Sequence, residues 1–516
     1  MSVEPGAPRA PAAAPLGRRV VLYTLHTASG RLFGILVWMV VTPAILHAIG
    51  TASFAVWSLF FAFTGYLSAL DFGLVLGTVR HVASARGRGE SDESGRYATL
   101  GLLGFLALAA LWMALTLLLR EHALRWLRVP PAAIADARQA MLLAPGVFAL
   151  AGCANITSAV AQGCGRFDVA NLVMVTASAE QAIGVYVVLH SRWGLRGLLL
   201  NVGVGWALSG IAGLVLLART VPDFHWRSPR SSLGRLREVF RFGGVLQITN
   251  LLSAIHNQLD KFLLSRFVAL DAITPYELGS RVALSASTVP GLLLVGILPT
   301  AAGIHAVHDE QRLRRLYERS NRYVLLAGAA IVAATIAASD RLYLAWLGPG
   351  HQASAFTFQA LMFGMVASLA TGVGTSLARG IGRPDLEAWF AVVVVGLHLA
   401  LSLWLVPSIG YRGALVAWGV SNAAGAIFFL LLLARTMRWP WAGVLIRPHL
   451  VPALAAVISS AAAWALARVL PGSHGVVAWA IVLVLCATAG AVVALVGLAT
   501  RYVDWGETRS LLAPGR

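Results

Sequence analysis

The chain has 516 residues, of which 58% are hydrophobic and only 12% are charged, and its mean hydropathy is +0.75. Soluble domains carry about 25% charged residues, so this composition excludes a soluble globular protein. A net charge of +18 would suggest nucleic acid binding in a soluble protein. Here the basic residues lie mostly between apolar stretches, where membrane topology accounts for them, and we expect no nucleic acid partner.

Apolar stretches long enough to span a bilayer recur along the whole chain. They predict an all-α membrane protein with about 14 transmembrane helices, arranged as two six-helix bundles plus a C-terminal helix pair. In chain order, the predicted spans cover residues 20–46, 52–74, 97–119, 139–161, 168–190, 197–218, 241–264, 276–302, 322–346, 355–379, 386–406, 412–434, 446–469 and 475–500.

These spans define the expected domains. Residues 1–19 are rich in Pro and Ala and are expected to form a disordered cytosolic tail. Each bundle begins with a basic segment that enters a polar-interrupted helix, which is a two-fold plan typical of transporters. The predicted boundaries are 20–219 for the first bundle, 220–240 for a cytosolic linker, 241–439 for the second bundle, 440–500 for the extra pair and 501–516 for a cytosolic tail.

The distribution of basic residues predicts the orientation. With a cytosolic N-terminus, the two tails and the even-numbered loops with their flanks carry 27 of the 40 Lys and Arg residues, and the odd-numbered loops carry 12. Cytosolic loops carry the excess of positive charge in membrane proteins. We therefore expect a multi-pass protein of a bacterial inner membrane with both termini in the cytosol.

Motifs for enzyme chemistry are absent from the sequence. Lys261, the only lysine, follows Asp260, so there is no phosphate-binding loop that ends in Gly-Lys. There is no G-x-S-x-G or H-E-x-x-H motif. Cys153, Cys164 and Cys486 lie in apolar surroundings without metal-ligand spacing. We expect a protein that is not an enzyme and that has no catalytic residue, cofactor or metal site.

Charged residues inside predicted spans point to a polar path, because each costs about 2.5–3.5 kcal/mol to insert. Arg31 lies in the first span and shares a helical face with Thr24 and Thr27. It is expected to face a cavity, and the alternative is that it reaches the cytosolic headgroups.

The seventh span has one polar face. Its five polar residues fall within an arc of about 100° when drawn at 100° per residue. A water-filled groove is one interpretation, and hydrogen bonding between helices that only holds the bundle together is the other. The residues of this face are Gln247, Asn250, Asn257, Gln258 and Lys261.

The carboxylates are candidates for ion coupling. Glu277 and Arg281 are spaced i,i+4 in the eighth span, either as a cavity arginine tuned by a carboxylate or as a self-neutralised pair near the outer surface. Glu180 lies near mid-depth of the fifth span, either as a proton carrier or as a structural hydrogen-bond donor. Asp260, the third candidate, lies off the polar arc and is expected to pair locally at the outer end, and His398 is expected to be structural.

Several segments resemble the polysaccharide-transport family of flippases, which belongs to the superfamily of multidrug, oligosaccharidyl-lipid and polysaccharide exporters. The resemblance covers about residues 20–500. The segments that carry it are LDFGLVLGTVRHVASA at 70–85, QLDKFLLS at 258–265, YELGSR at 276–281, LPTA at 298–301, RLRRLYERS at 312–320 and AWLG at 345–348.

This resemblance implies two bundles around a central cavity and transport by alternating access. Related lipid II flippases hold a diphosphate with arginines in helices 1 and 8, where this chain has Arg31 and Arg281. The implied function is the flipping of a polyprenyl-diphosphate-linked oligosaccharide to the outer leaflet for lipopolysaccharide or exopolysaccharide synthesis. The expected partners are that substrate, membrane lipids and the polysaccharide polymerase or export machinery.

Three alternatives remain open at this point. A multidrug or cation antiporter of the same fold would need an acidic cavity that attracts cations. A polytopic polymerase or ligase of the same pathway would need a large outward loop with catalytic residues, and the outward loops here are short. A scaffold that transports nothing is the third alternative.

Overall fold

The computed structural model describes residues 16–71, 73–191, 193–229, 236–292, 294, 297–471 and 475–503. Over this part of the chain the regular secondary structure is helical and contains no strand, which confirms the predicted fold class. The expected tails lie largely outside it, although residues 16–19 already belong to the first helix.

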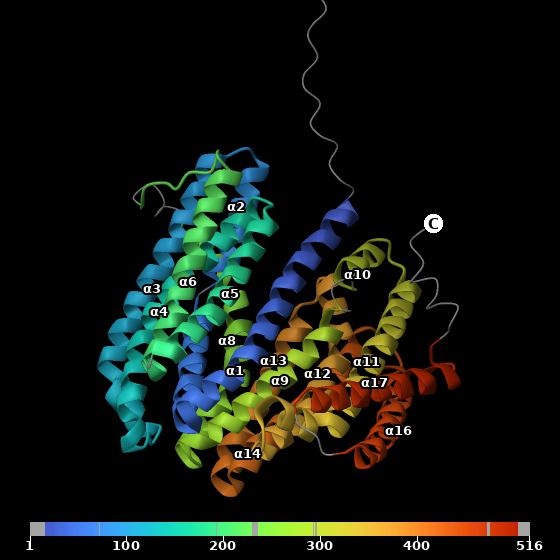
Figure 1. Cartoon of the computed structure of the whole chain (residues 1–516). Helices are drawn as coiled ribbons and strands as arrows, with labels where there is room; N and C mark the ends of the chain where they lie inside the picture. The colour runs from blue at the N-terminus through green and yellow to red at the C-terminus, as the bar shows by residue number, and fades with distance from the viewer. Residues whose placement is uncertain are drawn as a thin grey trace, which may run out of the picture.

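The first group of helices is built around a long, bent α1. At Gly50, φ is 73° and ψ is 174°, a conformation that favours glycine, and the chain reverses there. Figure 1 shows both arms of α1, which match two predicted spans. The group comprises α1 (Leu16–Ala69), α2 (Leu74–Gly87), α3 (Ser91–Trp126), α4 (Ile134–Gly163), α5 (Phe167–Ser191) and α6 (Gly194–Thr220).

The second group begins after the segment that connects α6 to α8, of which the structure describes residues 221–229. The last two long helices of the chain pack mainly against α11 and against each other. This group comprises α8 (Leu236–Phe267), α9 (Ile273–Leu292), α10 (Ile297–Ala306), α11 (Glu310–Leu347), α12 (Gln352–Gly380), α13 (Asp385–Ile409), α14 (Tyr411–Thr436), α15 (Trp441–Leu445), α16 (Arg447–Val469) and α17 (Val476–Ala499).

The spans predicted at 52–74 and 97–119 leave residues 75–96 as a connecting loop, but these residues are largely helical, so that expectation is wrong. α2 buries Leu74, Gly77 and Val82, and it packs against α3 and α4. The basic residues of this segment concealed the helical spacing of its apolar positions.

Eleven helices in the described part of the chain are long and apolar enough to cross a membrane. The bent α1 supplies two crossings instead of one, and the more polar α8 and α9 add two further candidates, so the structure is consistent with about 14 spans. Large apolar side chains such as Val40, Leu118 and Val469 are at least 75% exposed. Such a surface is suited to lipid rather than to water.

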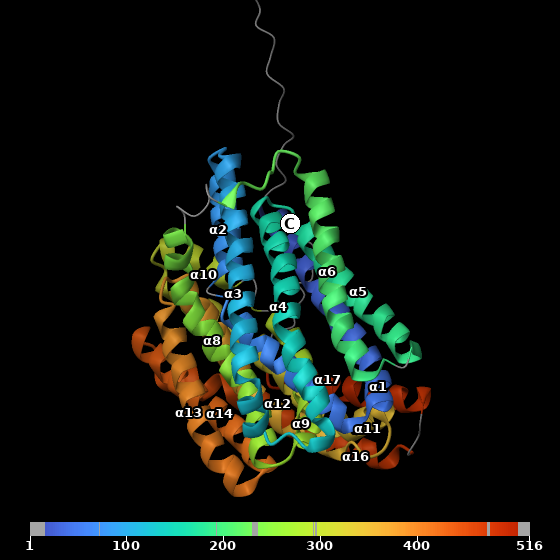
Figure 2. The same ribbon diagram turned by 90° about the vertical axis from the view of Figure 1, so that its left-hand side faces the viewer.

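The two groups of helices converge on one side of the molecule. We call the side where α1 begins the near face, and the opposite side, where α1 turns at Gly50, the far face. Figure 1 shows the groups closer together at the far face than at the near face, and Figure 2 shows α3, α4 and α6 running between the two faces.

Among the described residues, three side-chain hydrogen bonds join the groups on the far-face side. In each, a donor in the second group meets a backbone carbonyl of the first. The bonds run from Trp346 Nε1 to the Met39 carbonyl at 2.6 Å, from Thr274 Oγ1 to the Thr51 carbonyl at 2.8 Å, and from Ser265 Oγ to the Leu127 carbonyl at 2.8 Å.

Candidate functional site

Three charged side chains form a compact triad on α8 and α9. The Glu277 carboxylate lies 2.5 Å from Lys261 Nζ and 2.5 Å from Arg281 Nε. The side chains of Glu277 and Lys261 are only 4% and 5% exposed. Two positive groups therefore share one carboxylate, and the triad retains one net positive charge.

The guanidinium of Arg281 is the exposed part of this charge triad. Its side chain is 36% exposed, and its carbon lies 5.5 Å from the ring centroids of both Trp38 and Phe61. Among the hydrogen bonds of the described residues, Arg281 donates only from Nε, to Glu277. Two aromatic faces and one ion pair thus fix the guanidinium and leave its outer edge for a ligand.

Two cavities meet at Arg281. The first, of about 320 Å³, is lined by α1, α5, α6 and α9, and the second, of about 290 Å³, is lined mainly by α8, α9, α12 and α14. Phe61, Glu277 and Arg281 line both cavities. The arginine therefore stands at the boundary between a cavity of the first group and a cavity of the second.

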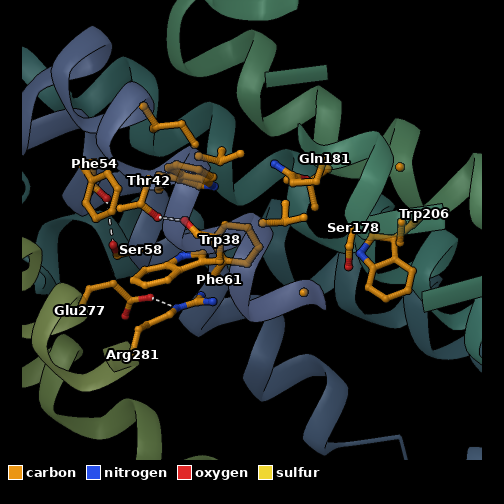
Figure 3. Close-up of a pocket in the computed structure, with 18 of the residues that line it drawn as sticks. Trp38, Thr42, Phe54, Ser58, Phe61, Ser178, Gln181, Trp206, Glu277 and Arg281 are labelled. Carbon is orange, nitrogen blue, oxygen red and sulfur yellow. Dashed lines mark hydrogen bonds and ion pairs between the residues drawn. The ribbon is translucent and has the colours of Figure 1, made fainter. Parts of the chain in front are cut away.

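The first cavity has an aromatic wall with scattered polar groups. Figure 3 shows Gln181, Ser178 and Trp206 opposite Trp38, Phe61 and Arg281. Its side chains include Trp38, Phe54, Trp57, Phe61, Trp206, Thr42, Ser58, Ser178 and Gln181.

The second cavity is lined by part of the polar face predicted for the seventh span. Asn257, Gln258 and Lys261 line it together with Ser280. Gln258 Oε1 accepts a hydrogen bond of 2.8 Å from Lys261, and Asn257 donates to the Ser253 carbonyl. These residues line a cavity, in agreement with the interpretation of the polar face as a groove. The side chains of Gln247 and Asn250 lie outside the described residues. The side chain of Arg31 lies outside them as well.

Asp260 does not pair locally, so that expectation is wrong. Its carboxylate accepts hydrogen bonds from the Tyr276 hydroxyl and, at 3.1 Å, from Ser402 Oγ. The same carboxylate lies 3.2 Å from His398 Nε2. Asp260 is 2% exposed, and His398 and Ser402 are fully buried. This Asp260 cluster joins α8, α9 and α13, because helix packing brings together residues that are far apart in the sequence.

His256 extends the Asp260 cluster toward α14. Its ring stacks on Trp418 with centroids 4.2 Å apart and lies 4.8 Å from the His398 ring. Its Nε2 is 3.3 Å from Asn422 Nδ2. Sequence reasoning missed this extension, because nothing in the sequences of α8 and α14 indicates that His256 and Asn422 will meet.

Glu180 lies behind the first cavity and not in its wall. A Cβ built on Gly205, a wall residue, would collide with Glu180 Oε2, so the glycine makes room for the carboxylate. Glu180 Oε2 has no hydrogen-bond partner in the described part of the chain. The structure thus separates Glu180 from the triad and from the Asp260 cluster, and the three candidate coupling carboxylates occupy three different places.

Comparison with known proteins identifies relatives of this architecture. The model of a family described as "Polysaccharide biosynthesis protein" matches residues 20–305. A Shigella flexneri protein named "Putative O-antigen transporter" is 20% identical over 398 residues, which cover 75% of this chain and 91% of the relative.

Solved structures show the same fold. The lipid II flippase MurJ in an inward closed conformation matches with a TM-score of 0.72 and 13% identity, covering 93% of this chain and 99% of MurJ. An inward-facing multidrug resistance transporter of the MATE family, in the MOP superfamily, matches with a TM-score of 0.67 and 16% identity, covering 78% and 94% of the two chains. These findings confirm the resemblance seen in the sequence, and all of these relatives are named as transporters or flippases.

Proposed function

The chain belongs to the polysaccharide biosynthesis protein family, and we propose that it flips a polyprenyl-diphosphate-linked oligosaccharide from the cytosolic to the outer leaflet by alternating access. The product would enter lipopolysaccharide or exopolysaccharide synthesis. The observation that carries this proposal is the fixed, half-exposed guanidinium of Arg281 at the boundary of two cavities.

A diphosphate fits the outer edge of Arg281 by charge and geometry. Guanidinium groups bind phosphate oxygens through paired N–H donors, and such charge-assisted bonds are among the strongest in proteins. Lys261 offsets Glu277, so the triad can offer its remaining positive charge to the substrate. The lipid tail needs no polar path because it can stay in the bilayer. Arg31, on the first arm of α1, is the second arginine that we assign to this path.

The Asp260 cluster is the element to which we assign ion coupling, in preference to Glu180 or Glu277. Its carboxylate is buried and bonded to groups on two other helices, so gain of a proton would change contacts that hold α8, α9 and α13 together. Glu277 is paired with both Lys261 and Arg281, and Glu180 Oε2 has no hydrogen-bond partner in the described part of the chain. Alternating access that is driven by an ion needs a group whose protonation changes the packing of helices.

The antiporter alternative has some support in the fold, because MATE-family transporters share it. An aromatic cavity would also suit a lipophilic cation. The net positive charge at Arg281, which lines both cavities, opposes that cargo. Drug resistance on overexpression that Arg281→Ala leaves intact or increases would favour the antiporter.

We place the protein in a bacterial inner membrane with the near face toward the cytosol, which follows from the bias of basic residues. Labelling of single cysteines from either side of the membrane tests this orientation. Near-face positions should react only after the cells are opened.

Depletion of the protein in its own cells tests the function. We expect a lipid-linked oligosaccharide to accumulate on the cytosolic face, and the same accumulation when Arg31→Ala or Arg281→Ala replaces the wild type at normal membrane levels. Unchanged glycan export with either variant would overturn the role of that arginine. Depletion without accumulation of any lipid-linked sugar would overturn the proposed function itself.

A further inference from the structure

We propose that the first cavity is a saccharide subsite, in which the sugar next to the diphosphate stacks on an aromatic wall and hydrogen-bonds to the polar groups opposite. This inference rests on the proposed function. It goes further by assigning the part of the substrate that the wall recognises and the side chains that recognise it.

Position gives the first reason. Arg281 lines the first cavity, and the first sugar of such a substrate is bonded directly to the diphosphate. If the outer edge of Arg281 holds a phosphate, that sugar must lie within a few atoms of it. The aromatic residues Trp38 and Phe61, which hold the guanidinium, continue directly into the cavity wall.

The chemistry of the wall is the second reason. A sugar ring has an apolar face of C–H groups and an edge of hydroxyl groups. Indole rings offer a large flat surface with a negative face that attracts C–H groups. Trp38, Trp57 and Trp206 all line this cavity. Figure 3 shows Trp206 across the cavity from Trp38, so aromatic surfaces are present on both sides of the space.

The polar groups of the wall complement hydroxyls. Thr42, Ser58 and Ser178 each donate to a carbonyl of their own helix, so their oxygens remain available as acceptors. Gln181 has no hydrogen bond among those found for the described residues and can both donate and accept. A purely hydrocarbon ligand, such as the prenyl tail, could form no hydrogen bonds with these groups.

An unsatisfied donor in the wall agrees with a polar ligand. Trp57 is only 7% exposed, and in the described part of the chain its Nε1 has no hydrogen-bond partner. Buried polar groups without partners are rare in native proteins. A ligand whose hydroxyl oxygens enter this cavity would supply an acceptor for Trp57 Nε1.

Size limits the ligand. A cavity of about 320 Å³ lies at the lower end of the range of about 300–1,000 Å³ that small-molecule sites occupy. We therefore assign it to the sugar that adjoins the diphosphate. The rest of the glycan would extend beyond it, which would let one transporter accept varied outer sugars.

The test compares two groups of soluble probes on the purified protein in lipid nanodiscs. One is farnesyl diphosphate, and the other is a panel of farnesyl-diphosphate-linked monosaccharides: glucose, galactose and N-acetylglucosamine. Calorimetry gives the ratio of their dissociation constants. We expect at least one sugar-bearing probe to bind wild type about tenfold more tightly than farnesyl diphosphate.

Variants assign this gain to the wall. Trp206→Leu should abolish the gain and leave the affinity for farnesyl diphosphate unchanged. The matched control is Trp404→Leu, because Trp404 is 67% exposed on α13 and lines neither cavity. Arg281→Gln should weaken both groups of probes by a similar factor.

Two results would overturn the subsite. One is that no sugar-bearing probe gains over farnesyl diphosphate, and the other is that the gain survives Trp206→Leu. Binding of farnesyl diphosphate that depends on Arg281 would still support the proposed function in either case. If wild type binds none of the probes, both the proposed function and the subsite fail.

Discussion

Lys261 Nζ lies 2.5 Å from the Glu277 carboxylate, and both side chains are at least 95% buried. A buried carboxylate needs compensation, and removal of one partner of such a pair is strongly destabilising. Arg281, the other partner of Glu277, is instead 36% exposed. The buried lysine therefore maintains the charge balance, while the arginine faces the cavities.

The first prediction concerns this balance. Lys261→Met should leave Glu277 to neutralise Arg281, and the affinity for farnesyl diphosphate should fall about tenfold, equivalent to about 1.4 kcal/mol. The double variant Lys261→Met/Glu277→Gln removes both charges and should restore most of the affinity, because Arg281 is then unopposed. Calorimetry on the two purified variants checks this. A double variant that binds no better than Lys261→Met contradicts the account.

The second prediction concerns the far-face closure. Thr274→Val removes the hydroxyl that donates to the Thr51 carbonyl. The loss of one hydrogen bond costs about 1 kcal/mol, which should raise the population with an open far face roughly fivefold. Spin labels on cysteines introduced at Ala48 and Ala269, after removal of the native cysteines, report the separation of the two groups.

Thr335→Val is the matched control for this measurement, because Thr335 donates only to the Ile331 carbonyl of its own helix. It should leave the distribution of label distances unchanged. A distribution that responds equally to both substitutions would show that Thr274 has no special role in closure.

The third prediction concerns coupling. Asp260→Asn should bind the substrate but lose the dependence of transport on a pH gradient, because the side chain can no longer gain or lose a proton. The titratable groups around it are His398, His256, Lys261 and the tyrosines Tyr66, Tyr276 and Tyr411. Transport by proteoliposomes, with and without an imposed gradient, checks this.

Asp271→Asn is the control for coupling, since Asp271 is an exposed carboxylate in the short turn before α9. It should respond to the gradient as the wild type does. If Asp260→Asn still responds fully, the coupling assignment is wrong and Glu180 becomes the next candidate.

The fourth prediction concerns stability. A Cβ added at Gly413 would collide with the backbone of Leu405 and Val406, which cannot move like a side chain. Gly413→Ala should therefore destabilise the protein by about 1–3 kcal/mol, the usual cost of overpacking. Gly419→Ala, on the same helix, meets no atom within 4 Å and should be neutral or slightly stabilising. Thermal unfolding of the two variants in detergent gives the comparison, and equal melting temperatures would contradict it.

Hydropathy alone predicted most of the helices, because a bilayer forces apolar residues into long runs. It failed where polarity and helix coexist. The arginines of α2 made a packed helix look like a connecting loop.

The site was predictable only in part. The i,i+4 spacing of Glu277 and Arg281 correctly indicated their ion pair. The sharing of Glu277 with Lys261, and the meeting of Asp260 with His398, depend on how α8 packs against α9 and α13. Local periodicity carries no information on such contacts, since Lys261 and Glu277 lie on different helices and Asp260 and His398 are 138 residues apart in the chain.

The role of Arg281 is the central claim, and headgroup translocation in proteoliposomes tests it most directly. Protein reconstituted with a fluorescent polyprenyl-diphosphate-linked sugar is compared as wild type, Arg281→Ala and Arg412→Ala, where Arg412 is an exposed arginine that lines neither cavity. We predict that only Arg281→Ala loses most of the translocation rate at equal protein content. A rate for Arg281→Ala equal to that of wild type would contradict the account.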